Sequence, residues 1–297
     1  MPPNAEGAAV SVLRLGRSSF GPGEFAVMAI VNRTPDSFYD RGATFAFEQA
    51  WRRVEQVVAE GADIVDVGGV KAGPGAPVDE DEEIARTADL VAAIHEKFAD
   101  VVVSVDTYRA GTAAALCEAG AELVNDTWAG ADPEVAAVAA EHGAGLVCSH
   151  TGGQRPRTLP HRVRYADVVD DVVRDTTALA ERAAGLGVAP ESLLLDPTHD
   201  FGKNTYHSLE LTRRLDELVG TGWPVLVSLS RKDFVGETLG LPVGERLPGT
   251  LGATAISAWH GARVFRAHDV AATRQVLDMV AAVRGDRRPV APYRGLA

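Results

Sequence analysis

The stretch Gly61-Ala62-Asp63-Ile64-Val65 decides the fold, because phrases of the same kind return three more times along the chain. In each one a glycine follows an alanine-rich amphipathic segment and precedes an apolar run. A glycine that ends a helix can take the left-handed conformation, and an apolar run directly after it is typical of a buried parallel strand. Each phrase therefore predicts a helix-to-strand joint. The other three are Gly120-Ala121-Glu122-Leu123-Val124, Gly143-Ala144-Gly145-Leu146-Val147 and Gly261-Ala262-Arg263-Val264-Phe265.

The joints are part of a longer alternation of apolar runs and helix-compatible segments. Eight strands alternating with helices over about 250 residues are typical of a (β/α)8 TIM barrel. No early G-x-G-x-x-G sequence opens a helix, which argues against an open doubly wound sheet. We predict a single α/β barrel domain over residues 24–285, a loose N-terminal lead-in at 1–23 and a C-terminal tail at 286–297. The predicted strands are 26–31, 63–67, 101–105, 122–124, 145–149, 193–195, 225–229 and 263–266.

Charge and composition restrict the class of partner. The 297 residues include 29 Lys and Arg against 41 Asp and Glu, which gives a net charge of −12. Such acidity argues against nucleic acid and membrane surfaces as partners. No apolar run approaches the roughly 20 residues needed to span a bilayer. The only cysteines, Cys117 and Cys148, exclude a disulfide framework, so we expect a cytoplasmic protein that binds small molecules.

Polar residues follow most of the predicted strands, at the end of a barrel where enzymes hold their active sites. A single Asp or Asn at a strand end is usually a turn or a helix cap, but their joint occurrence favours a small-molecule site. Carboxylates and an amide suit a flat heterocycle with N–H donors, whereas arginine, histidine and a second amide suit phosphate oxygens. The residues at the strand ends are Asn32, Asp66, Asp106, Asn125, Asp196, Lys232, Arg266 and His268.

These residues belong to six motifs that resemble, in order, the successive motifs of dihydropteroate synthases. The resemblance implies a (β/α)8 barrel that joins a dihydropterin carrying a pyrophosphate to p-aminobenzoate, with Mg2+, in folate biosynthesis. It also implies a homodimer. The motifs are Asn32-x-Thr34-Pro35-Asp36-Ser37-Phe38, Ser104-Val105-Asp106-Thr107, Val124-Asn125-Asp126, Leu195-Asp196-Pro197 with Phe201-Gly202-Lys203, Ser230-Arg231-Lys232 and Arg266-x-His268-Asp269.

The resemblance also implies a role for each matching residue. The pterin ring would be held by Asp106, Asn125, Asp196 and Lys232. The pyrophosphate would be held by Asn32, Arg266 and His268, with Asn32 also binding the metal. The catalytic residues would be Asp36 and Asp40 of the first loop together with Lys232. The side of the second substrate would include Phe38, Pro74, Phe201, Lys203 and Asp233.

The match is weakest on the side of the second substrate and the pyrophosphate. Dihydropteroate synthases usually read G-G-E-S-T-R-P-G after the second strand, but here Lys71-Ala72-Gly73 replaces Ser-Thr-Arg. Losing that arginine typically costs about tenfold to a hundredfold in affinity, unless Lys71 compensates. Asp233 stands where the family usually has Ser or Arg, and its carboxylate would repel the carboxylate of p-aminobenzoate. Thr198 and Asp200 replace glycines, which adds side chains near the same pocket.

We therefore expect a dihydropteroate synthase homologue that keeps the pterin pocket and has weak, altered or no standard activity. In this it resembles the divergent second paralogue found in actinobacteria. Three alternatives stay open at this point: a fully active synthase, a methyltetrahydrofolate-dependent methyltransferase built on a similar barrel, and a non-catalytic pterin-binding barrel. The sequence leaves open whether the chain is an enzyme, and it does not identify the true second substrate.

Overall fold

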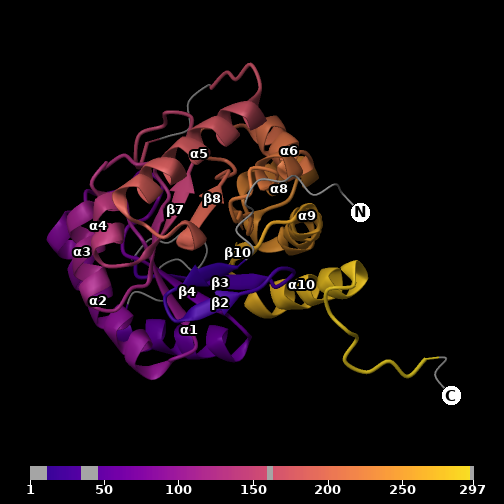
Figure 1. Cartoon of the computed structure of the whole chain (residues 1–297), viewed down its shortest axis with the longest axis horizontal. Helices are drawn as coiled ribbons and strands as arrows, with labels where there is room; N and C mark the ends of the chain where they lie inside the picture. The colour runs from indigo at the N-terminus through magenta and orange to yellow at the C-terminus, as the bar shows by residue number, and fades with distance from the viewer. Residues whose placement is uncertain (1–11, 35–45, 159–162, 295–297) are drawn as a thin grey trace.

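Eight parallel strands form one sheet inside a ring of helices in the computed structural model, which describes residues 12–34, 46–158 and 163–294 (Figure 1). The order of the strands is β8-β7-β6-β5-β4-β3-β10-β9, and a parallel bridge between Leu195 and Val225 joins the two ends of the sheet. The predicted TIM barrel is therefore confirmed. Its strands are β3 (Ala26–Asn32), β4 (Ile64–Gly68), β5 (Val102–Asp106), β6 (Leu123–Asp126), β7 (Gly145–Ser149), β8 (Leu193–Asp196), β9 (Leu226–Ser228) and β10 (Val264–Ala267).

The helices cover the outside of the sheet, and each contributes buried hydrophobic residues to the core around it. In the first helix the buried residues are Ala50, Val54 and Val57, which share one face at helical spacing. All four joint glycines have a positive φ, between 64° at Gly143 and 113° at Gly120, as the recurring phrases predict. The helices are α1 (Phe47–Ala59), α2 (Glu80–Lys97), α3 (Ala110–Glu118), α4 (Val135–Glu141), α5 (Val168–Leu186), α6 (Thr205–Arg213), α7 (Leu215–Val219), α8 (Asp233–Leu239), α9 (Leu247–His260) and α10 (Val270–Arg284).

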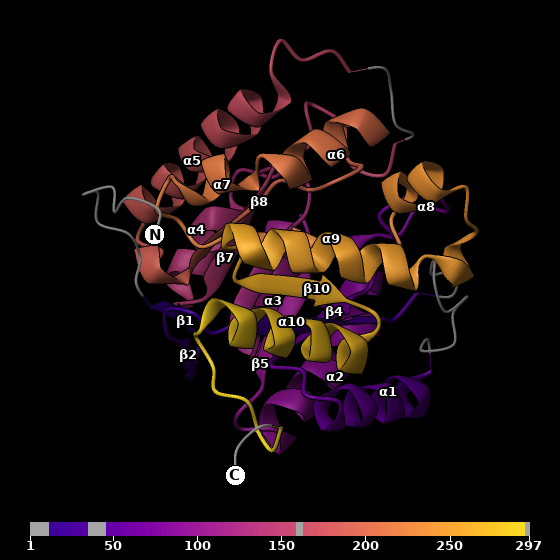
Figure 2. The same ribbon diagram turned by 90° about the vertical axis from the view of Figure 1, so that its right-hand side faces the viewer.

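A short hairpin closes the N-terminal end of the barrel. Residues 12–23, expected to be part of a loose lead-in, instead carry the antiparallel strands β1 (Leu13–Leu15) and β2 (Ser18–Phe20). Leu13 and Leu15 are fully buried and pack on the inward-facing apolar residues at the base of the barrel strands. Figure 2 shows the hairpin at the end of the barrel opposite α8. The site must therefore open at the other end, where the strands terminate.

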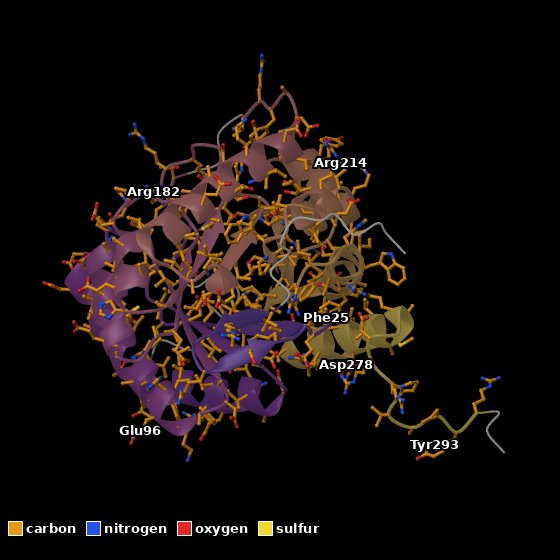
Figure 3. All side chains as sticks on the ribbon, viewed as in Figure 1. Phe25, Glu96, Arg182, Arg214, Asp278 and Tyr293 are labelled. Carbon is orange, nitrogen blue, oxygen red and sulfur yellow. The ribbon has the colours of Figure 1, made fainter. Side chains whose placement is uncertain are left out.

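The chain leaves the barrel after α10. Residues 286–294 are exposed and contain no helix or strand, and Figure 3 shows Tyr293 on this segment, well away from the barrel. In the described part of the chain, no helix combines the length and the apolar character needed to cross a membrane.

Candidate functional site

A cavity of about 330 Å³ opens at the C-terminal ends of the barrel strands. This volume lies within the usual range for small-molecule sites, which is roughly 300–1,000 Å³. The wall combines residues from β3, β5, β9 and β10 with the loops that follow β4 and β8. The structure thus brings together many of the residues that the strand ends predict: Asn32, Pro74, Asp106, Phe201, Lys232, Asp233, Arg266 and His268.

Arg266 holds the centre of a charge network at the floor of the cavity. Its Nε donates to Asp66 Oδ2 at 2.6 Å, and its Nη2 donates to Asp106 Oδ2 at 2.8 Å. Asp66 is fully buried and also accepts hydrogen bonds from Ser104 Oγ at 2.6 Å and Asn125 Nδ2 at 3.1 Å. The guanidinium expected to bind pyrophosphate therefore already faces two carboxylates of the protein.

Asp66 is a component of this network to which the family motifs assigned no role. The available signal was its register, since Asp66 lies five residues after the joint glycine Gly61, where a purely structural strand would stay apolar. Its carboxylate orients Arg266 in the wall and Asn125 behind the wall.

Asp106 lies in the wall and is the carboxylate best placed to accept N–H groups of a ligand. Burial raises the pKa of Asp106 to about 7, while Arg266 and a hydrogen bond from Thr127 Oγ1 at 3.0 Å act in the opposite direction. The side chain therefore changes its charge near neutral pH.

Asn125 and Asp196 lie behind the wall of the cavity. Asn125 is 2% exposed and Asp196 is 3% exposed. The Oδ1 atom of Asp196 accepts a hydrogen bond from the backbone N–H of Thr198 at 2.7 Å, and burial raises the pKa of this carboxyl, against the effect of Lys232. Both residues adjoin the predicted pterin position, but neither contributes to the wall in this structure.

Lys232 stands at the start of α8 and lines the cavity. Its Nζ donates to the carbonyl oxygen of His199 at 2.6 Å and lies 5.0 Å from the centre of the Phe201 ring. Burial lowers the pKa of Lys232, and the carboxylates of Asp196 and Asp200 act in the opposite direction. The ammonium group thus contacts a carbonyl and a ring, and two nearby carboxylates favour its charged form.

His268 and Asn32 line the side of the cavity expected to receive the pyrophosphate. Burial, together with Arg266, lowers the pKa of His268 to about 3, so its imidazole is neutral at pH 7. Its Nδ1 lies 2.9 Å from Ser230 Oγ. Neutral His268 and the paired Arg266 give this side of the cavity little positive charge of its own.

The loop 197–204 after β8 forms the next part of the wall and contains two strained positions. Thr198 has φ 51° and Asp200 has φ 72°, a region that favours glycine. The side chain of Lys203 holds this loop, because its Nζ donates to the carbonyl oxygens of His150 at 2.8 Å, Phe201 at 2.9 Å and Thr198 at 3.2 Å. Lys203, expected beside the second substrate, is buried behind Phe201 and does not line the cavity.

Gly202, in the same loop, is a position where a side chain should reduce stability. It has φ 61°, and an added Cβ atom would lie 1.9 Å from the carbonyl oxygen of Thr151. Gly143 has a similar φ of 64° but nothing within 4 Å of such an atom. Gly143→Ala should cost about 1–2 kcal/mol for the φ alone. Gly202→Ala should cost about 1–3 kcal/mol more, because the clash is with backbone. Urea denaturation of the two variants measures the difference, and equal losses would contradict the close packing.

Asp200 and Asp233 meet at the mouth of the cavity, and both line it. Asp233 Oδ1 accepts a hydrogen bond from Arg246 Nη1 at 2.8 Å, and the backbone N–H of Asp233 donates to Asp200 Oδ2 at 2.7 Å. Trp128 packs edge-on against Phe201, the residue after Asp200, with ring centroids 5.1 Å apart. The wall of the cavity thus combines acidic and aromatic side chains. Asp36, Phe38 and Asp40 of the first loop lie outside the described residues.

Comparison with known proteins agrees with this site. The sequence profile of the family described as "Pterin binding enzyme" matches residues 28–268. The chain is 61% identical over 275 residues to a Mycobacterium leprae protein named inactive dihydropteroate synthase 2, with 91% of this chain and 94% of that protein covered. It is 58% identical to a Mycobacterium tuberculosis protein of the same name, with coverages of 91% and 86%. A Yersinia pestis dihydropteroate synthase, solved in complex with a sulfonamide drug, superimposes with a TM-score of 0.87 at 34% identity and covers 93% of this chain and 100% of its own.

Proposed function

Because this chain belongs to the pterin-binding enzyme family, as a homologue of dihydropteroate synthases, we propose that it binds a pterin in the barrel cavity and has weak or no standard synthase activity. One observation carries the second part of the proposal. Within the cavity wall formed by Val70–Pro74, Lys71 is the one cationic side chain, because Ala72 and Gly73 supply no side-chain donor to a pyrophosphate. Arginine at such a position would add a charge-assisted, bidentate contact.

The proposed pterin position lies against Asp106 and Lys232, with Asn125 and Asp196 behind them. Carboxylates and an ammonium group at the floor suit the N–H donors and ring nitrogens of a pterin. In the standard reaction pyrophosphate leaves, the pterin methylene bears transient positive charge and an aniline nitrogen attacks it. That step requires strong stabilisation of the leaving anion. The neutral imidazole of His268 and the paired guanidinium of Arg266 supply little of it.

Mg2+ fits this site only together with a phosphorylated ligand. Asn32 offers an amide oxygen, which is a suitable ligand for Mg2+, and the described residues include no cluster of three His, Cys, Asp or Glu side chains. When bound, Mg2+ would neutralise the leaving pyrophosphate. Asn32 would contact it, and phosphate oxygens and water would provide the other ligands.

A coupled assay with the dihydropterin pyrophosphate, p-aminobenzoate and Mg2+ tests the proposal. We expect turnover below about one hundredth of that of an ordinary synthase, since the missing contact alone is worth about tenfold to a hundredfold. The double variant Ala72→Thr/Gly73→Arg should recover pyrophosphate affinity, and a Cβ atom added at Gly73 would lie an ordinary 3.7 Å from Cε of Lys71. Wild-type turnover equal to that of an ordinary synthase would show a fully active enzyme. Binding of methyltetrahydrofolate would instead favour the methyltransferase alternative.

The proposal includes a homodimer formed through α9 and α10. These helices lie side by side in both ribbon views (Figures 1 and 2), and they expose Ile256, Trp259, Met279 and Val283. Exposed apolar side chains gathered on neighbouring helices are typical of an interface. The proposal also includes a cytoplasmic location, which the free thiols of Cys117 and Cys148 support.

The double variant Trp259→Glu/Met279→Glu is expected to sediment as a monomer, because it places charges in the proposed interface. Leu186→Glu, at a 46% exposed position at the end of α5, serves as the matched control and should leave the wild-type state unchanged. Analytical ultracentrifugation distinguishes the two. A monomeric wild-type protein, or an unaltered dimer in the double variant, would contradict this interface.

A further inference from the structure

A carboxylate of this chain occupies the start of α8 at the mouth of the cavity. Asp200 Oδ2 accepts hydrogen bonds from the backbone N–H groups of Asp233 at 2.7 Å and Phe234 at 3.3 Å. Its Oδ1 accepts one from Ser208 Oγ at 3.2 Å. These two N–H groups are thus already satisfied by Asp200, which has φ 72°.

The cations beside α8 also face carboxylates of the protein. Lys232 is flanked by Asp196 and Asp200 and donates to the carbonyl oxygen of His199. Arg246 pairs with Asp233 and donates further hydrogen bonds to the carbonyl oxygens of Leu241 and Arg231. A carboxylate brought to this side of the mouth by a ligand would thus meet Asp200 and Asp233, beside a lysine that two carboxylates of the protein already attract and an arginine that is already paired.

Two aromatic side chains form part of the wall beside these charged groups. Phe201 and Trp128 pack edge to face, and both line the cavity. Aromatic side chains in this arrangement bind planar rings through their faces and edges. A ring is thus favoured at the mouth, whereas a negative charge beside it is not.

We propose that the mouth of the cavity binds an aromatic amine whose ring carries an uncharged or cationic group, and that Asp200 excludes amines that carry a carboxylate. This inference rests on the proposed function, because the amine would lie beside a pterin bound deeper in the same cavity. Asp200 acts here as a specificity residue. Asp233 adds a second negative charge at the rim, where its side chain is 65% exposed.

Isothermal titration calorimetry tests the inference on the full-length protein saturated with hydroxymethylpterin. The probes are p-aminobenzoate and p-aminobenzamide, which have nearly the same shape and differ in charge. We expect the amide to bind at least about tenfold more tightly, because a like charge beside Asp200 is costly. In Asp200→Asn the preference should fall to less than about threefold, since the amide oxygen can accept the same two N–H groups and asparagine tolerates a positive φ.

Two further variants provide a second measure of the charge effect and a matched control. Asp233→Asn should reduce the preference by a smaller factor, and it measures the effect of rim charge if Asp200→Asn folds poorly. Asp278→Asn, on the outer face of α10 (Figure 3), is the matched control and should leave the preference unchanged. A wild-type preference below about tenfold, or a preference that survives in Asp200→Asn, would overturn the inference while pterin binding stands. Failure of hydroxymethylpterin itself to bind wild-type protein would instead overturn the proposed function.

Discussion

Replacing Arg266 with methionine is expected to lower the free energy of unfolding by about 3–5 kcal/mol, the usual cost of removing one partner of a buried ion pair. The guanidinium faces Asp66 and Asp106, and Asp66 is fully buried. Without it, Asp66 and Asp106 remain close together in the barrel and lose the cation that pairs with both. Urea denaturation followed by circular dichroism measures the loss.

Two controls separate this effect from a general loss of packing. Arg287→Met removes an ion pair with Asp278 on the surface, where both side chains are more than a third exposed, and should cost about 0–1 kcal/mol. Adding Asp66→Asn to Arg266→Met removes one of the stranded charges and should restore part of the stability. If Arg266→Met lost no more than Arg287→Met, the network would not support the barrel as described.

Asp106→Asn is expected to weaken pterin binding by about tenfold to a hundredfold at pH 8, the usual value of a hydrogen bond to a charged group. Because burial raises the pKa of Asp106 to about 7, its carboxyl is largely protonated at pH 5 and largely ionised at pH 8. A heterocycle that donates N–H groups prefers the ionised form. Wild-type affinity should therefore rise with pH through about 7, whereas the affinity of the variant should stay flat. Calorimetric titration with hydroxymethylpterin across this range measures both.

The raised pKa of Asp106 has the opposite effect on the stability of the folded protein, which should fall as the pH rises. Folding favours the protonated form of Asp106. The stability that this side chain contributes to the folded protein is therefore fully present below the unfolded pKa of about 3.9, and it is lost as the pH rises through about 7. The ligand-free protein should thus lose stability over the range in which it gains pterin affinity. Asp278→Asn serves as the control for both profiles. A wild-type affinity independent of pH would contradict the placement of Asp106 against a donor of the ligand.

The barrel could be predicted because its signal is local and repeated. Each joint glycine stands two or three residues before the start of its strand, and all eight predicted strands occur within one or two residues of their observed bounds. The hairpin at Leu13–Leu15 and Ser18–Phe20 escaped prediction because strands of three residues carry too little periodicity. Its place is set by packing under the barrel, which is a contact between distant segments.

The residues around the cavity could be predicted, but not the direction in which each side chain points. Strand ends brought Asp106 and Arg266 into the wall and placed Asn125 behind it, a difference decided by the hydrogen bond from Asn125 to Asp66. The side chain of Asp200 bonds to N–H groups 33 and 34 residues further along the chain. No local pattern reports such a contact, because it depends on how the loop after β8 meets α8.

The hairpin under the barrel and the residues in which this chain departs from ordinary synthases lie at opposite ends of the barrel. Leu13 and Leu15 seal the base, whereas Ala72, Gly73, Asp200 and Asp233 line the cavity at the other end. Exchanges at these four positions therefore leave the packing of the base untouched. The same sealed base can support different chemistry at the open end.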